Sequence, residues 1–448
     1  MSGQTSPPES SESVGDLRAA LRGTGLVLSI RVAAAAIAYV SIVLLARWMG
    51  AVELGIYTYA FAWLALASIP AGLGLPTVCV RFLPAYFQAS DWPRLKGLLL
   101  FAFGATLAIG LGLGVSAAIG VRALGTALRP DYVTPLSIAL GGLAEMTTLV
   151  LASQVGRASG WLALAYAPSQ IVYPVLLLAA VAWLSRSGGG PTAARVVPIS
   201  LGIAALVVGA QITLYARRLA GRLRGTAATF ESALWMRTAF SIVLFEGFFA
   251  LLGQTDIVLV GVFLSPQDVA YYGAAVRTAI LVRFVTDGVG TLIGPGIAQL
   301  ASRHRSGEMQ RLLRGTLPWS LLSATAVFLV LAAAGRHVLA LFGQEFTVAW
   351  PAMLLLAGAN LIRTAIGPGA LVLNMTGHQT DCAWAYFAAA LVNVAGNLLL
   401  IPRFGLPGAA FSTAVTMIGA DLFLRLRVGR RLGLDPSVTC LLRRAARP

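Results

Sequence analysis

Long apolar segments separated by short polar ones dominate this chain. A helix needs about 20 residues to cross the roughly 30 Å hydrocarbon core of a bilayer. Twelve runs of about that length are present, and we expect each to form a transmembrane helix, at 25–46, 55–78, 97–121, 134–153, 160–184, 196–216, 238–262, 270–297, 315–335, 350–374, 380–401 and 406–424. The first run carries Arg31 and is followed by eleven more, so we do not interpret it as a cleaved signal peptide.

The composition agrees with an all-α polytopic membrane protein. Hydrophobic residues make up 58% of the 448 residues, charged residues only 11%, and the mean hydropathy is +0.81. A soluble globular domain carries about 25% charged residues, so this chain could not cover a water-facing surface of its size. The three cysteines, Cys79, Cys382 and Cys440, form no even-numbered or closely spaced framework, which predicts neither a disulfide nor a metal site.

The basic residues predict the orientation. With the N-terminus inside, 22 of the 33 Lys and Arg residues fall in cytoplasmic segments, seven fall outside and four lie within predicted spans. Short cytoplasmic loops hold an excess of basic residues, so both termini are predicted to be cytoplasmic. The net charge of +16 is spread over these loops, which favours contact with anionic membrane lipids and not with nucleic acid.

The two halves of the chain repeat weakly. When the segment that begins at Gly50 is aligned with the segment that begins at Ser265, Glu53 falls on Asp268 and Tyr57 falls on Tyr272. Because each half has an even number of spans, the halves would share one orientation about a pseudo-twofold axis along the membrane normal. The predicted organisation is therefore a disordered cytoplasmic tail, an N-lobe of six helices, a cytoplasmic loop, a C-lobe of six helices and a basic cytoplasmic tail, at 1–22, 23–216, 217–237, 238–427 and 428–448.

Three segments carry a resemblance to a known family. They are "LLARWMGAVELGIYTYAFAWLALASIPAGLGLPTVCVRFLPAY", "DIVLVGVFLSPQDVAYYGAAVR" leading to "IGPGIAQLASRHRSGEMQRLLR", and "NLLLIPRFGLPGAAFSTA". The chain resembles the polysaccharide biosynthesis and oligosaccharide flippase proteins from Gly23 to about Arg427. Their superfamily includes the multidrug and toxin extrusion (MATE) antiporters and the lipid II flippases. Many members have fourteen spans, whereas twelve are predicted here.

The resemblance implies a MATE-like fold and a transporter with no catalytic residues and no prosthetic group. It implies that an undecaprenyl-pyrophosphate-linked oligosaccharide moves from the cytoplasmic to the periplasmic leaflet of a bacterial inner membrane by alternating access. The glycan would serve lipopolysaccharide or exopolysaccharide biosynthesis. Glycosyltransferases and a glycan polymerase would be its partners, and a proton or sodium gradient could drive transport.

Charged residues within the predicted spans are the candidate site. An ionised side chain in the middle of a bilayer costs at least ~2.5 kcal/mol, so each one calls for a reason. Arg is suited to bind phosphate because its planar fork donates two parallel hydrogen bonds. Arg31 and Arg363 have no obvious acidic neighbour on their own helix and are the first candidates for binding pyrophosphate, followed by Arg277 and Arg283.

Ion pairing is the alternative role of these charges. Asp256 and Arg277 lie at equal distances from the centre of a predicted hairpin and could pair across it. Arg283 and Asp287 stand four residues apart on one helical face. Glu145 in the other lobe could pair with Arg363. The carboxylates of Glu145, Glu246 and Asp287 could instead bind a coupling proton or sodium ion.

Other functional classes fit less well. The only lysine is Lys96, and no phosphate-binding loop surrounds it, so ATP hydrolysis by this chain is not expected. The predicted external loops are too short to carry the chemistry of a glycan polymerase. A multidrug antiporter is the serious alternative, but four arginines within spans favour an anionic cargo over a cationic drug.

Overall fold

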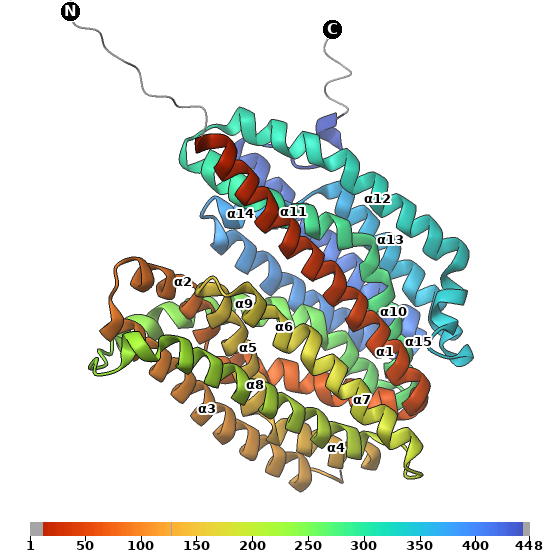
Figure 1. The fold of residues 1–448 in the computed structure, drawn as a ribbon. Helices are drawn as coiled ribbons and strands as arrows, with labels where there is room; N and C mark the ends of the chain where they lie inside the picture. Colours follow the sequence, from red (N-terminus) through yellow and green to blue (C-terminus); the bar gives the residue numbers. More distant parts are fainter. Residues whose placement is uncertain (1–11, 127, 442–448) are drawn as a thin grey trace, which may run out of the picture.

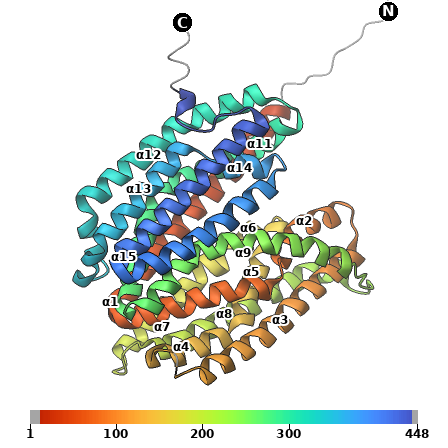
Figure 2. The same ribbon diagram turned by 180° about the vertical axis from the view of Figure 1, so that it is seen from behind.

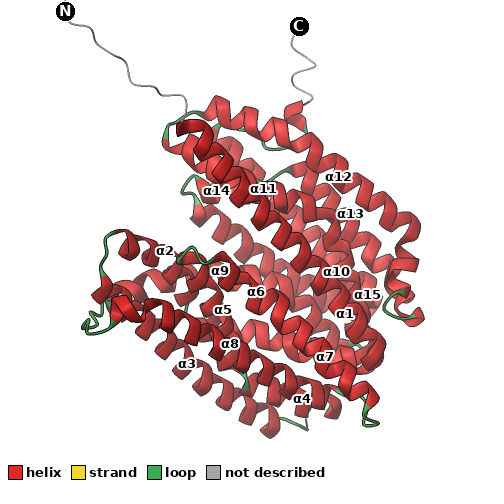
Figure 3. Ribbon diagram, in the orientation of Figure 1, coloured by secondary structure: helices red, strands yellow, loops and turns green. Residues whose placement is uncertain are grey.

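The computed structural model describes residues 12–126 and 128–441, and within them the side chains of 12–32, 241, 242 and 244–246 are left undescribed. Every regular element in these residues is a helix (Figure 3). Eight helices in the described part of the chain are long and apolar enough to cross a membrane, or nine if one bent pair is a single span. The chain is therefore a multi-pass membrane protein.

The first half of the chain forms eight α-helices and one π-helical turn. They are α1 (Glu12–Gly72), α2 (Leu75–Gln88), α3 (Trp92–Ala123), α4 (Pro130–Gly141), α5 (Leu143–Ala158), α6 (Leu162–Ala167), η1 (Pro168–Val172), α7 (Tyr173–Arg186) and α8 (Ala193–Leu223). Gly50 interrupts α1 with a φ of 76°, a conformation that favours glycine. This break divides α1 between the first two predicted spans.

The second half forms seven α-helices and two short 3₁₀ turns. Its elements are α9 (Ser232–Phe263), α10 (Pro266–Ala279), η2 (Ile280–Arg283), α11 (Phe284–Ser302), α12 (Ser306–Ala340), η3 (Gln344–Ala349), α13 (Trp350–Ile366), α14 (Gly369–Met375) and α15 (Gln379–Leu432). Gly405, with a φ of 59°, interrupts α15 in the way that Gly50 interrupts α1.

Helix boundaries recur at the offset that the sequence repeat predicts. The helix after Gly50 corresponds to α10, which begins at Pro266 after Ser265. The starts of α3 and α12 keep nearly the same offset, and so do those of α6 and α15. In α10 the start is fixed by a capping box, in which Ser265 and Asp268 each accept a hydrogen bond from the other's backbone N–H.

The helices form two groups that diverge at one end (Figures 1 and 2). One group contains the second half of α1 together with α2 to α8, and the other contains α10 to α15. The first half of α1 lies along the second group, where Tyr39 and Thr278 share a hydrogen bond of 3.1 Å. At Gly55 the second half of α1 approaches α10 so closely that a Cβ would overlap the Pro266 carbonyl. The two groups are therefore in direct contact at one end.

Contacts near helix ends distinguish the two ends of the molecule. At one end Arg94 pairs with Glu231 at 2.9 Å, and Lys96 donates to the Thr226 carbonyl. At the other end Arg47 donates to the carbonyl oxygens of Leu341 and Ala340 at 2.6 and 2.8 Å. Each of these contacts joins segments that the distribution of basic residues predicts to lie on the same side of the membrane.

Several predicted boundaries are wrong by one to three turns of helix. The inter-lobe loop is shorter than 217–237, because α8 continues to Leu223 and α9 begins at Ser232. The tail predicted to be disordered, 1–22, overlaps α1 from Glu12 onward, while 1–11 lies outside the described residues. Polar residues at both ends of these helices continue the helix beyond its apolar segment. Hydropathy alone therefore predicts helices that are too short.

The predicted basic tail, 428–448, is also partly folded. α15 continues to Leu432, and the Val438 N–H then donates to the carbonyl of Ala365 at the break between α13 and α14. Gln310 and Arg425 both contact Asp435. Burial acts to raise the pKa of the Asp435 carboxyl, but hydrogen bonds from Thr439 and Ser437 outweigh it and hold that pKa below its ordinary value.

Candidate functional site

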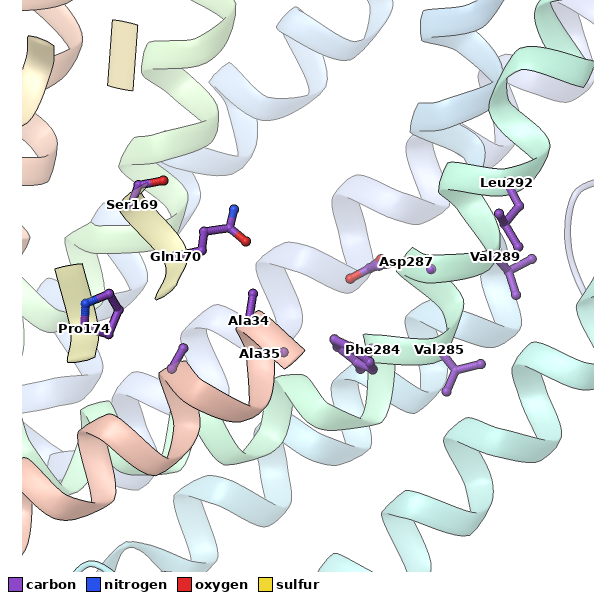
Figure 4. Close-up of a pocket in the computed structure, with 12 residues that line it drawn as sticks. Ala34, Ala35, Ser169, Gln170, Pro174, Phe284, Val285, Asp287, Val289 and Leu292 are labelled. Carbon is purple, nitrogen blue, oxygen red and sulfur yellow. The ribbon is translucent and has the colours of Figure 1, made fainter. Parts of the chain in front are cut away.

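A cavity of about 630 Å³ lies where the first half of α1 meets both groups of helices. Its three walls come from α1, from η1 with the start of α7, and from α11 (Figure 4). The lining residues are Ala34, Ala35, Ala38, Ser169, Gln170, Pro174, Phe284, Val285, Asp287, Gly288, Val289 and Leu292. The wall is mostly apolar with a few polar groups, as is usual for a ligand site.

Local sequence explains two of the walls. Small alanines on α1 leave space that larger side chains would fill. The π-helical turn η1 begins at Pro168, and Pro174 lies just after it at the start of α7. Neither proline has an N–H to donate within the helix, which favours a local departure from α-helical hydrogen bonding. This turn carries Ser169 and Gln170, and Figure 4 shows Gln170 and Asp287 pointing toward each other across the cavity.

Asp287 brings a network of charges to the cavity wall. Its carboxylate accepts a hydrogen bond of 3.0 Å from the guanidinium of Arg283, one turn earlier. The predicted pairing of these two residues is confirmed. The Asp287 side chain remains 55% exposed, whereas that of Arg283 is 23% exposed. Asp287 is thus the member of this pair that a molecule in the cavity meets first.

Arg363 is paired, but with a residue that the sequence analysis did not select. Its Nε donates to Asp421 Oδ2 at 2.7 Å, and the same oxygen lies 3.9 Å from Arg283 Nη1. Asp421 therefore joins Arg363 on α13 to Arg283 at the end of η2. The sequence analysis did not select Asp421 because it falls near the end of the predicted span 406–424, where a charged side chain can reach water. In the structure α15 continues well beyond it, to Leu432.

The alternative pairing of Arg363 with Glu145 is not formed. Glu145 lies in the first turn of α5, and its Oε2 is buried with no hydrogen-bond partner among the described residues. The Nη1 of Arg363 donates to Asn360 Oδ1 at 3.4 Å and to the Met417 sulfur at 3.1 Å, both within the second group of helices.

The predicted ion pair between Asp256 and Arg277 is not formed either. Asp256 accepts hydrogen bonds from the Tyr272 hydroxyl at 2.7 Å, from Thr413 at 3.3 Å and from the Ile257 N–H at 2.9 Å. Counting outward from the hairpin places the residues at equal depth but does not fix which face of each helix they occupy. Tyr272 rather than Arg277 lies on the face of α10 that meets Asp256.

Arg277 consequently stands without a carboxylate. It makes no hydrogen bond or ion pair with any residue that the structure describes, although it lies about 16 Å along the helix from Pro266. Its Nη1 approaches Gly273, beside Thr58 of α1, and the Tyr57 hydroxyl is within electrostatic range. The Arg277 side chain is exposed, although its neighbour Thr278 is buried. It therefore has free space on one side, next to α1.

Two further predicted site residues cannot be compared with the structure. The side chains of Arg31 and Glu246 lie outside the described residues, although the backbone places Arg31 within α1 and Glu246 within α9.

Comparisons with known proteins agree with this architecture. Residues 20–301 match the model of a family described as "Polysaccharide biosynthesis protein". A curated relative, the probable low-salt glycan biosynthesis flippase Agl15 of Haloferax volcanii, is 22% identical over 392 residues, which are 85% of this chain and 78% of that protein.

Solved structures share the fold at low sequence identity. An inward-facing multidrug resistance MATE family transporter of the MOP superfamily has a TM-score of 0.74 at 11% identity, over 91% of this chain and 98% of that one. The lipid II flippase MurJ, in an inward closed conformation, has a TM-score of 0.65 at 14% identity, over 93% and 91%. The expected MATE-like fold is thereby confirmed.

Proposed function

The chain belongs to the polysaccharide biosynthesis protein family, and from this premise we propose that it is a flippase for a lipid-linked oligosaccharide. The cargo is an oligosaccharide on a polyprenyl pyrophosphate, such as undecaprenyl pyrophosphate, made by glycosyltransferases and consumed by a glycan polymerase. It crosses from the cytoplasmic to the periplasmic leaflet of a bacterial cytoplasmic membrane by alternating access, without covalent chemistry. The flippase named among the relatives supports this class of cargo.

Arg277 is the observation that carries the proposal. A guanidinium held about 16 Å inside a spanning segment is costly unless an anion neutralises it. No carboxylate among the described residues pairs with Arg277. A pyrophosphate group supplies the missing charge and accepts parallel hydrogen bonds from the guanidinium. We assign Arg277, rather than Arg363, as the first phosphate ligand, with Arg31 and Arg283 as further candidates.

The arrangement of helices supports two lobes of six spans each. Division of α1 at Gly50 and of α15 at Gly405 accommodates four of the twelve spans, and the recurring boundaries support a repeat about an axis along the membrane normal. The excess of basic residues supports a cytoplasmic location for both termini, where the same residues would contact anionic lipids. The end of the molecule at Arg94 and Lys96 then faces the cytoplasm.

Reporter fusions test this orientation. A reporter joined after Gly225 or Arg303 should be active as a cytoplasmic fusion, and one joined after Ser187 or Ser265 as a periplasmic fusion, because basic loops stay inside. Alkaline phosphatase and green fluorescent protein activities in intact cells give the readout. The reverse pattern would contradict the direction of transport proposed above.

A buried network around Asp256 is the best-formed candidate for binding a coupling ion. Thr413 links Asp256 to Asn393, and Asn393 accepts a hydrogen bond from Asn397 at 3.0 Å. The Oδ1 of Asn397 is buried without a hydrogen-bond partner in the described part of the chain. Carboxylate, hydroxyl and amide oxygens suit a hard cation, and an intramembrane carboxyl suits a proton. Glu145, Glu246 and Asp287 remain candidates for the same role.

Reconstitution tests the proposed function against drug antiport. The purified protein in liposomes should move a fluorescent oligosaccharide linked to a polyprenyl pyrophosphate, and an imposed sodium or proton gradient should change its rate. A lipophilic cation, tetraphenylphosphonium, should not be accumulated, since the proposed site is cationic. Transport of the cation without the oligosaccharide would replace the proposed function by multidrug antiport.

A further inference from the structure

Four charged side chains of the second group of helices form a network that leads inward from the cavity. In order they are Asp287, Arg283, Asp421 and Arg363, joined at 3.0, 3.9 and 2.7 Å. The exposed fraction falls from 55% for Asp287 to 23% for Arg283, 12% for Asp421 and 15% for Arg363. The network is thus open to solvent at an acidic end and buried at the other.

The two carboxylates are not equivalent. Asp421 presents one oxygen to both guanidiniums, so it holds Arg283 and Arg363 side by side in spite of their like charges. Asp287 takes part in one ion pair among the described residues, with Arg283, from the next turn of the same continuous helical segment. With both carboxylates in place the four residues are neutral, but Arg283, Arg363 and Asp421 alone carry one net positive charge.

We propose that Asp287 is an internal counter-anion, which occupies Arg283 in the empty carrier and gives it up to the pyrophosphate of the cargo. This inference rests on the proposed function and adds to it a residue that sets how tightly the anion is held. Asp421 keeps Arg283 in position, and the cargo replaces Asp287 at the exposed face of its guanidinium. Binding of the anion replaces the negative charge that departure of Asp287 removes.

The geometry favours displacement of Asp287 by the cargo over displacement of the more buried Asp421. An ion pair with a half-exposed carboxylate contributes little because water competes for both groups, so Asp287 is easily displaced. The pair between Arg363 and Asp421 is desolvated and would leave an uncompensated charge if broken. Asp287 also lies on the cavity wall facing Gln170, whereas Asp421 is not among the lining residues. Competition at Asp287 lets the carrier release a highly charged cargo that an unopposed cluster of arginines would retain.

Binding of farnesyl pyrophosphate to the full chain in nanodiscs of neutral lipid tests the inference. Asp287→Asn removes the competing charge with little change of shape and should bind the probe about fivefold more tightly than the unsubstituted protein. Asp287→Glu keeps the charge and should bind it like the unsubstituted protein. Glu308→Gln is the matched control, because Glu308 forms a similarly exposed pair with Arg305 at 3.0 Å outside the cavity.

The outcomes separate this inference from the proposed function. If the unsubstituted protein binds farnesyl pyrophosphate and Asp287→Asn binds it equally or more weakly, the counter-anion is refuted while the flippase proposal stands. If no variant binds the probe, and tetraphenylphosphonium binds in a manner that Asp287→Asn weakens, both are refuted, since Asp287 would then be a ligand for cations. Tighter binding by Glu308→Gln as well would show a general effect of net charge and would also refute the inference.

Discussion

Replacing Arg277 with alanine should strongly reduce transport of the lipid-linked oligosaccharide while the protein still accumulates in the membrane. Arg277 has no carboxylate partner among the described residues, so its removal leaves no buried charge behind and should not destabilise the fold. Hydrogen bonds to a charged group contribute about 1.5–3 kcal/mol, which corresponds to a loss of roughly tenfold to a hundredfold in flux. Initial rates in liposomes, divided by the amount of protein inserted, measure the effect.

Two further variants define the role of Arg277. Arg277→Lys keeps the charge without the planar fork and should recover only part of the flux. Arg305→Ala removes an arginine of an exposed loop pair and should transport normally. Unchanged flux with Arg277→Ala would remove the observation on which the proposed function rests.

Replacing Arg363 with alanine should chiefly destabilise the protein. Asp421 would be left buried beside Arg283 alone, at 3.9 Å, and an uncompensated buried charge costs about 3–5 kcal/mol. The Arg363→Ala protein should therefore accumulate poorly and melt at a lower temperature in detergent. Quantitative immunoblotting of membranes and a thermal-shift assay measure both quantities.

A double substitution separates pairing from ligand binding at Arg363. Arg363→Met combined with Asp421→Leu removes both charges, so this protein should be more stable than either single variant. Arg363→Ala protein that accumulates normally but does not transport would instead restore the role first predicted for Arg363, a direct contact with the cargo.

The division into long helices was accessible from the sequence, but the contacts within the site were not. Hydropathy and the internal repeat predict segments and their order, because burial in lipid imposes a length on each apolar run. They do not report which helices are neighbours. Asp421 and Arg363 are far apart in the sequence, and only the packing of α15 against α13 brings them to 2.7 Å.

Sequence spacing predicts ion pairs within one helix but not pairs between helices. Arg283 and Asp287 are four residues apart on a continuous helical segment, where spacing alone brings side chains together. Asp256 and Arg277 belong to different helices, whose rotation about their axes depends on all their neighbours. Tyr272, aligned with Tyr57 in the sequence repeat, is the residue that meets Asp256.

The close approach of Gly55 to Pro266 fixes one end of the molecule by shape. Backbone lies against backbone there, and a Cβ at position 55 would overlap the Pro266 carbonyl. In the proposed alternating-access cycle the two groups of helices would have to part at this contact. Opening of this end would then depend on the fit of two backbones, separately from the charged residues proposed to bind the cargo.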